Sequence, residues 1–170
     1  AKKAIVWPNN GNIVMAAKQA AEVSDIPVGI VPSKTISQGL TAMLSFNPDA
    51  SVDDNVEAMS EDLDTVVSGE VTQATRDTEI DDVEIHKNDY LGIIDGNIKV
   101  DNADLIKTTT EMIEKMLDED SEIITIMFGR DSNEEEAQEV VSQLEEKHDD
   151  LEFEIHDGGQ PVYHFLVSVE

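Results

Sequence analysis

Apolar and polar positions in the first 46 residues follow the order strand, polar loop, helix, and then repeat it. Short apolar runs at residues 5–7 and 28–31 are each cut off by a polar segment that begins with proline, and apolar residues at helical spacing follow. Two strands joined through a helix pair in parallel, with a right-handed crossover. The pattern therefore predicts that both loops lie at one sheet edge, where open α/β sheets bind ligands.

Residues suited to helix capping begin both predicted helices. Asn10 is expected to cap the first helix, and Thr35 with Gln38 has the form of a capping box for the second. Backbone N–H groups and the positive ends of two helix dipoles would then face one crevice, where Lys34 adds a charge. The loops are thus a candidate site for an anion or a polar ligand. The alternative is that these residues only cap helices and that Lys34 is solvated.

Beyond residue 46 the pattern changes from helical spacing to runs rich in β-branched residues. Ser51 is expected to cap a third helix, and residues 66–76 read as a strand with a bulge at Gly69. The acidic segment 77–84 is interpreted as a loop. The boundary between two lobes is placed near residue 66.

The second lobe mixes hairpin, helix and strand signals. Asp95-Gly96 predicts a hairpin turn, and Asp101 or Asn102 is expected to cap the helix that follows. The continuous apolar run 123–128 is typical of a strand covered on both faces. Ser132 with Glu135 forms a second expected capping box, and two further strands close the chain, one alternating over 151–155 and one apolar over 162–169. The predicted fold class is α/β, with a Rossmann-type parallel lobe over residues 1–66 and a mixed-sheet α/β lobe over residues 67–170.

Charge narrows the possible partners. The 170 residues carry a formal net charge of −27, which argues against nucleic acid and against anionic membrane surfaces. No apolar run approaches the roughly 20 residues that span a bilayer, so no membrane insertion is expected. A basic protein partner remains open, and so does a solvated, repulsive surface in a salt-tolerant host. The chain has no cysteine, which fits a cytoplasmic protein.

Few residues carry recognisable chemistry. The phosphate-binding loop, the dinucleotide fingerprint and the nucleophile elbow are absent from the sequence. No metal site is predicted, because no two of the four histidines stand at metal-ligand spacing. His156 and His164 flank a turn, and a pair facing each other across a hairpin is the weak alternative. Arg130, just past a buried strand, is interpreted either as an anion or partner contact or as a surface salt bridge.

Several short motifs resemble the C-terminal region of dihydroxyacetone-kinase-like proteins, a family that includes the ATP-binding subunit of bacterial fatty acid kinase. The matching segments, in order, are Pro8-Asn9-Asn10, Asn12-Ile13, Pro32-Ser33-Lys34-Thr35, Gln38-Gly39, Ser45-Phe46, Arg76-Asp77-Thr78, the 92–96 hairpin and Gly158-Gly159-Gln160-Pro161. Two departures are small: Ser33 stands where the family usually has threonine, and Ser37 stands where proline is common.

The resemblance implies a DegV-like fold and a fragment of a longer kinase protein. ATP and magnesium would belong to a separate N-terminal kinase domain, and no cofactor would bind this fragment. The implied role is docking and scaffolding: the fragment would engage a fatty-acid-binding DegV-type protein so that the kinase domain can phosphorylate the bound acyl group.

Two other functions stay open at this stage. The first is a domain that binds a small anionic or phosphorylated ligand through the two loops. The second is a free-standing phosphotransferase, which the missing phosphate loop disfavours. Whether this fragment is itself an enzyme is therefore left open, and none of its residues is assigned a catalytic role. The candidate ligand- or partner-binding residues are Asn9, Asn10, Asn12, Ser33, Lys34, Thr35, Gln38, Gly39 and Arg130.

Overall fold

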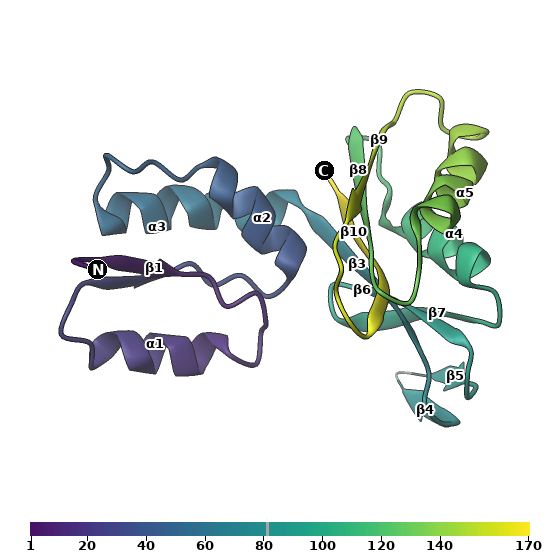
Figure 1. Ribbon diagram of the computed structural model, residues 1–170, viewed down its shortest axis with the longest axis horizontal. Coiled ribbons are helices and arrows are strands. Elements are labelled where there is room, and N and C mark those ends of the chain that lie inside the picture. Colours follow the sequence, from purple (N-terminus) through teal and green to yellow (C-terminus); the bar gives the residue numbers. More distant parts are fainter. Residues whose placement is uncertain (81) are drawn as a thin grey trace. The chain divides into compact units, whose positions relative to one another are not determined.

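Two β-sheets of different size organise the protein, each in its own compact unit. The computed structural model describes residues 1–80 and 82–170, and it divides into Ala1–Val66 and Val67–Glu170 (Figure 1). The first unit contains a two-stranded sheet. The second contains a six-stranded sheet and a separate two-stranded sheet.

The first unit is the predicted parallel arrangement. Strand β1 (Ala4–Val6) pairs in parallel with β2 (Val28–Ile30). Helix α1 (Val14–Glu22) covers one face of this pair, while α2 (Ile36–Leu44) and α3 (Val52–Glu61) lie over the other (Figure 1). A short 3-10 helix, Asp62–Thr65, ends the unit. The strand–helix–strand prediction is confirmed, and the carboxyl ends of both strands share one edge.

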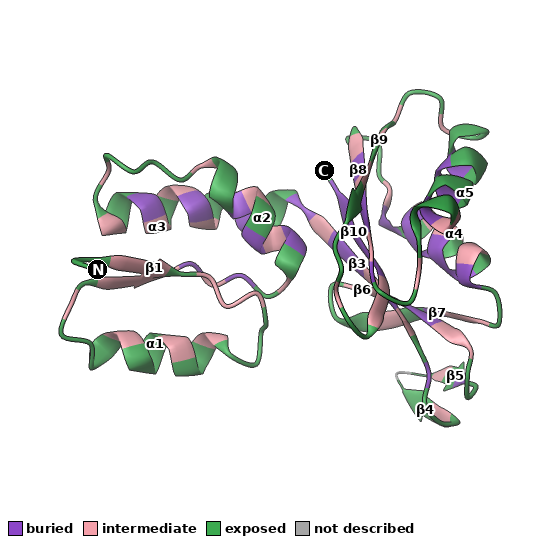
Figure 2. Ribbon diagram, in the orientation of Figure 1, coloured by how far each residue is buried: buried purple, intermediate pink, exposed green. Residues whose placement is uncertain are grey.

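The core of the first unit is small. Its buried apolar members are Val31, Ala42, Met59 and Leu63, with Ile5, Trp7 and Val56 packed partly buried against them. Gly29 lets α3 approach the sheet, because a Cβ there would lie 2.4 Å from Val56 Cγ2. Helix α1 has no buried residue, as its pink and green colouring in Figure 2 shows. This helix is therefore held by half-buried side chains only.

One of the capping predictions in this unit is wrong. Helix α1 begins at Val14, and no side chain caps it. Asn10 instead forms a turn: its Oδ1 accepts from Asn12 N at 2.9 Å and its carbonyl from Ile13 N at 3.0 Å. Thr35 and Ser51 cap α2 and α3 as predicted.

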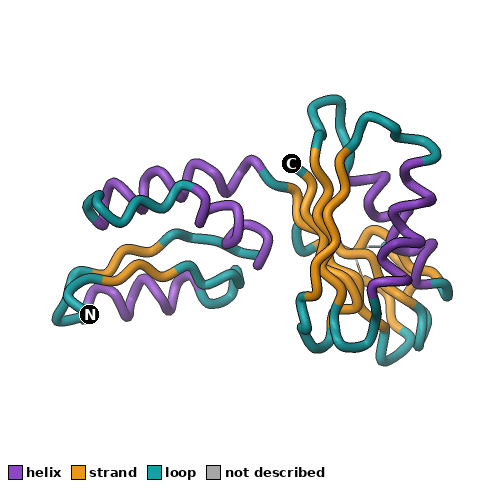
Figure 3. The backbone as a smooth tube through the Cα atoms, turned by 45° about the horizontal axis from the view of Figure 1, so that its top comes forward, coloured by secondary structure: helices purple, strands orange, loops and turns teal. Residues whose placement is uncertain are grey.

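The second unit is a mixed sheet covered by two helices. Its strands are β3 (Val67–Gln73), β6 (Tyr90–Ile94), β7 (Asn97–Asn102), β8 (Ile123–Phe128), β9 (Glu152–Asp157) and β10 (Tyr163–Val169). They lie in the order β7-β6-β3-β10-β8-β9, in which β8 and β9 pair in parallel and the other neighbours pair antiparallel. Helices α4 (Leu105–Met116) and α5 (Glu134–Glu145) lie on one face of the sheet (Figure 3). The predicted mixed α/β arrangement is confirmed.

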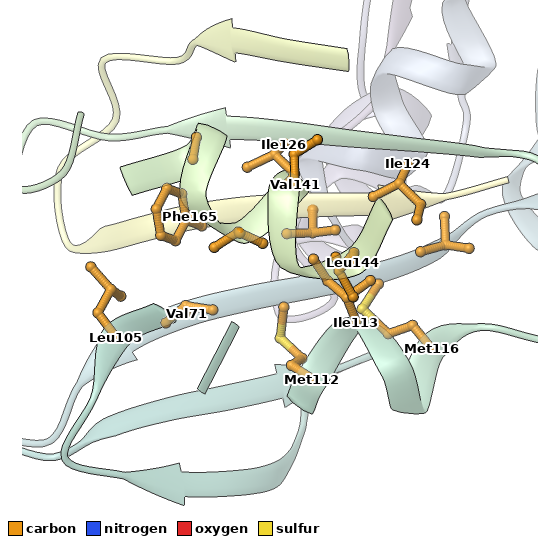
Figure 4. Packing of buried hydrophobic residues seen from close by; sticks show 14 of the residues in the cluster. Val71, Leu105, Met112, Ile113, Met116, Ile124, Ile126, Val141, Leu144 and Phe165 are labelled. Carbon is orange, nitrogen blue, oxygen red and sulfur yellow. The ribbon is translucent and has the colours of Figure 1, made fainter. Parts of the chain in front are cut away.

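The main core lies between this sheet and its two helices. Ile113, Ile126 and Phe165 are fully buried there, in the cluster that Figure 4 shows. The predicted bulge at Gly69 is wrong, because the register of β3 runs through that residue without interruption. The glycine instead provides space: a Cβ would lie 2.6 Å from Met116 Sδ and 2.7 Å from Met112 Cε.

The acidic segment predicted as a loop contains two short strands. Strand β4 (Thr78–Ile80) pairs antiparallel with β5 (Val83–Ile85), and Asp81, within the predicted loop, lies outside the described residues. Ile85 is buried with Ala74 and Leu91 in a small cluster of its own. Alternating apolar residues within the acidic run were the signal for this hairpin.

Two helix caps in the second unit lie next to the predicted residues. Asp104, and neither Asp101 nor Asn102, caps α4. The capping box of α5 is formed by Asn133 and Glu136, one residue beyond the predicted pair. Ser132 is occupied elsewhere, since its hydroxyl donates to the carbonyl of His164. The Asp95-Gly96 turn is confirmed, with φ of 46° and 85°.

Candidate functional site

The two loops predicted to form a site lie against each other. They follow β1 and β2 at the same edge of the parallel pair. The aliphatic stem of Lys34 lies over Gly11, where an added Cβ would be 3.7 Å from Lys34 Cγ. Most of the predicted loop residues lie in this contact region or in the first turns of α2.

Asn9 and Ser33 join the loops by a reciprocal pair of hydrogen bonds. The Ser33 hydroxyl accepts from the backbone N–H of Asn9 at 3.1 Å and donates to its Oδ1 at 2.8 Å. Ser33 is fully buried, and Asn9 takes a left-handed backbone with φ of 54°. The Asn9 amide lies against α2 at Gly39, where a Cβ would be 2.0 Å from Oδ1. Gly39 is therefore required by this contact.

Gln38 fastens the second loop to the end of the unit. Its Oε1 accepts from Lys34 N at 2.7 Å, and its Nε2 donates to the Leu63 carbonyl at 3.0 Å. Its own backbone N–H donates to Thr35 Oγ1 at 3.1 Å. The loops thus form a hydrogen-bonded framework in which Asn9, Ser33 and Gln38 already bond to protein atoms.

The groups that this framework leaves at the surface are fewer than the sequence predicted. Lys34, Asn10 and Asn12 are exposed. The exposed ammonium of Lys34 and the amides of Asn10 and Asn12 can contact an anion. The first unit also has a cavity, but that cavity lies elsewhere. That cavity, of about 280 Å³, is lined mainly by apolar side chains, including Trp7, Met43, Phe46 and Val52, and by none of the predicted site residues.

Arg130 lies in the second unit, in the loop after β8. Its Nε donates to the carbonyl of Gly159 at 3.1 Å, and its backbone N–H donates to the carbonyl of Gln160 at 3.0 Å. The guanidinium is thus bound to a turn carbonyl. The backbone of Tyr163 lies close to Gly129, the residue before Arg130, because a Cβ at Gly129 would lie 2.2 Å from Tyr163 O.

Two buried polar atoms lie close to this turn in the sequence. Gln160 Nε2 donates to Met127 O at 3.0 Å, while its Oε1 has no partner among the described residues. His164 Nδ1 also has none there, and its ring meets Tyr90 edge-on with centroids 5.2 Å apart. The alternative that paired His164 with His156 is wrong, because β8 lies between β9 and β10.

Burial perturbs two acid groups on neighbouring strands of the same sheet. Desolvation raises the pKa of Glu70 on β3 above its ordinary value. The pKa of the Tyr163 phenol on β10 is also raised, first by burial and then by the charge of Glu70. Neither residue was predicted as a site residue.

The sequence reading also missed a cluster at the β5–β6 connection. His86 Nδ1 lies 2.9 Å from Asp101 Oδ2 and 4.0 Å from Asp89 Oδ2. The Asp101 hydrogen bond is the main cause of a raised pKa for His86, although burial opposes it. Sequence spacing gave no signal, because the three residues are brought together by the pairing of β6 with β7.

Comparison with solved structures identifies the class of fold. The fold resembles the Fak B3 protein of Streptococcus pneumoniae, loaded with linoleic acid, with a TM-score of 0.63 and 12% identity, over 100% of this chain and 72% of that one. A DegV family protein of Corynebacterium glutamicum gives a TM-score of 0.64 at 14% identity, over 99% of this chain and 75% of that one. The fold is therefore DegV-like.

Sequence comparison gives the family. The family model for the C-terminal region of FakA-like fatty acid kinase proteins matches residues 1–170, and the chain belongs to this family. It is 41% identical over 169 residues to uncharacterised proteins of Staphylococcus aureus strains USA300 and N315, covering 99% of this chain. The chain spans only 31% of the length of these relatives. Among the described residues, no helix combines the length and apolarity needed to cross a membrane.

Proposed function

We propose that this chain is the partner-docking and scaffold domain of a fatty acid kinase protein. In this proposal it binds a fatty-acid-binding DegV-type protein and holds it where a separate N-terminal kinase domain can phosphorylate the acyl group. The observation that carries the proposal is the combination of two likenesses. The family is that of the C-terminal region of a kinase protein, while the fold is shared with proteins that bind fatty acids.

Charge complementarity supports docking by a physical argument. The charge of −27 would speed the encounter with a basic partner surface. Added salt should therefore slow association, and it should lower the association rate constant by a larger factor than the equilibrium affinity.

In this proposal the phosphoryl transfer takes place outside the chain. ATP and magnesium are assigned to the kinase domain of the longer protein, and no cofactor to residues 1–170. The cytoplasm, where a kinase meets ATP, is the proposed location. The fragment by itself should neither bind nor hydrolyse ATP.

Calorimetric titration of residues 1–170 against the DegV-type fatty-acid-binding protein of the same host tests the proposal. With the partner loaded with oleic acid, we expect a saturable one-to-one complex, and stopped-flow mixing of the same two proteins should give an association rate that falls with added salt. A parallel titration with ATP and magnesium should give no binding. The absence of a complex with about 100 μM of each protein would count against docking, because most specific protein complexes bind more tightly than this.

The ligand-binding alternative has weaker support. Asn9 and Ser33 already bond to each other, Gln38 bonds to Lys34 N and to the Leu63 carbonyl, and the Lys34 side chain is exposed. Titration with inorganic phosphate and with acetate separates the two functions. Saturable binding that Lys34→Ala abolishes would favour the alternative, while unchanged partner binding by Lys34→Ala would favour docking.

A further inference from the structure

Three side chains of types that can bind metal ions meet at β7. His86 follows β5, Asp89 precedes β6, and Asp101 lies near the end of β7. One ligand atom from each lies within 4.8 Å of the others. Asp101 stands opposite Leu91 in the β6–β7 pairing, and Leu91 belongs to the small cluster that holds the β4–β5 hairpin. The three residues thus meet where this hairpin joins the main sheet.

Asp101 is the unusual member of the cluster. Its side chain is only 7% exposed, and its Oδ2 faces the His86 ring at 2.9 Å. Its Oδ1 is buried with no hydrogen-bond partner among the described residues. A buried carboxylate oxygen without a partner is costly, because the water it had in the unfolded chain is not replaced. A cation held by both oxygens of this carboxylate would supply the missing interaction.

We infer that His86, Asp89 and Asp101 bind a divalent transition-metal ion of the zinc or manganese class. One imidazole nitrogen with two carboxylate oxygens is a ligand set that these ions accept. Calcium and magnesium prefer oxygen ligands throughout, so the histidine disfavours them. The role we assign to the ion is structural: it ties the end of the β4–β5 hairpin to β7.

The separations are close to those required by one ion. Ligand bonds of about 2.0–2.2 Å place neighbouring ligand atoms roughly 3–3.5 Å apart. The 2.9 Å between His86 Nδ1 and Asp101 Oδ2 lies just below this range, and the 4.0 Å from His86 Nδ1 to Asp89 Oδ2 lies above it, so each side chain needs a small movement. The His86 side chain is 58% exposed and that of Asp89 25%, so an ion can enter and keep bound water.

The two nitrogens of His86 have different surroundings. Nδ1 faces the two aspartates, whereas Nε2 lies 3.8 Å from Glu84 Oε1. Metal binding requires an unprotonated Nδ1, which leaves the proton on Nε2 and directed to the glutamate side. A carboxylate on the far side of a ligating imidazole commonly orients the ring. At 3.8 Å the Glu84 carboxylate is beyond hydrogen-bond distance, so it favours this orientation of the ring by charge alone.

Calorimetric titration of the tag-free chain with zinc, and separately with manganese, tests the inference. We expect one ion per chain, with affinity lowered at least tenfold in His86→Gln and in Asp101→Asn. His156→Gln is the matched control, because His156 forms an exposed pair with Glu154 at 3.2 Å outside the cluster. It should bind as the unchanged chain does. Equal affinities in His86→Gln and His156→Gln would overturn the inference, and so would displacement by equimolar magnesium.

A second measurement locates the ion without any substitution. Manganese is paramagnetic, and it should broaden the amide resonances of residues 84–89 and 100–102 first. A competing acidic surface is formed by Glu119, Asp120, Glu122, Asp150 and Glu152. Broadening centred on that surface would overturn the inference, because it would place the ion among oxygen ligands alone. This readout also holds if Asp101→Asn fails to fold.

Discussion

The two units differ in how much of their apolar surface they bury. Nine of the eleven large apolar side chains that are exposed among the described residues belong to the first unit, and only Ile80 and Val162 belong to the second. The first unit nevertheless has fewer residues, 66 against 104. Leu44 is 82% exposed on α2, whereas Phe165 is fully buried in the second unit.

Sheet size explains the difference. Parallel strands are usually buried on both faces within larger sheets, but β1 and β2 form a sheet of two and each has a free edge. Six strands against two helices enclose a continuous core. The comparison teaches that the second unit supplies most of the stability. The first unit leaves more of its large apolar side chains exposed to solvent.

Truncating the main core should produce the largest effect. Phe165→Ala is expected to cost about 3–5 kcal/mol, because it removes a fully buried ring between the sheet and its helices. Urea unfolding followed by far-ultraviolet circular dichroism measures it. Leu44→Ala, at an exposed position, should change the free energy of unfolding by less than about 0.5 kcal/mol. A comparable loss from both variants would remove the distinction between the units.

Adding one methyl group to the loop framework should have the next largest effect. Gly39→Ala places a Cβ 2.0 Å from Asn9 Oδ1, and we expect a loss of about 1–3 kcal/mol in chemical unfolding. The double variant Asn9→Ala with Gly39→Ala should lose less than the sum of the two single variants, because the clash is gone. Additive losses would show that Asn9 does not fix this position.

The helix caps allow a smaller test in matched pairs. Asn133→Ala removes the capping box of α5 and should cost about 1 kcal/mol in thermal or urea unfolding. Asn10→Ala should cost clearly less, since Asn10 forms a turn before α1 and caps no helix. An equal loss at Asn10 would mean that the turn matters as much as a true cap.

A surface ion pair should give the smallest effect, with a defined pH dependence. The Lys147 hydrogen bond at 3.0 Å, helped by His148, lowers the pKa of Glu114 below its ordinary value. A lowered pKa stabilises the folded state above the unfolded-state pKa, and this gain is lost as pH falls through the folded-state pKa. Glu114→Gln should cost about 0.2–1 kcal/mol at pH 7 and nothing in strong acid.

Glu111→Gln is the control on the same helix, where Glu111 is exposed. Its unfolding free energy should stay within about 0.3 kcal/mol of the unchanged chain at both pH values, as expected at a surface position. A Glu114→Gln deficit that persists in acid would assign the loss to packing instead of charge.

Local chemistry predicted most of the fold. Hydrophobic spacing predicted the parallel unit. Asp95-Gly96 predicted the β6–β7 hairpin of the second unit, because only a few residues adopt positive φ readily. Capping was less certain: Asp, Asn and Ser are interchangeable caps, so the predicted residues for α4 and α5 were displaced from the true caps. Gly69 was misread, because the methionines that require it are more than 40 residues away in sequence.

The candidate site was less predictable than the fold. Contact between the two loops followed from the parallel pairing, but the Asn9–Ser33 bonds did not, because the sequence does not say whether a polar group bonds a ligand or a neighbour. His86 meets Asp101 only in the observed register of β6 with β7, because a one-residue slip would turn the Asp101 side chain to the other face of the sheet.

The aromatic residues are divided between the units in a way that makes unfolding observable separately. Trp7, the only tryptophan, packs in the core of Ala1–Val66, and both tyrosines, Tyr90 and Tyr163, lie in Val67–Glu170. Tryptophan emission therefore reports on one unit, while tyrosine absorbance reports on the other. Denaturation curves from the two signals that fail to coincide would reveal an intermediate in which the small parallel unit has melted and the large mixed sheet persists.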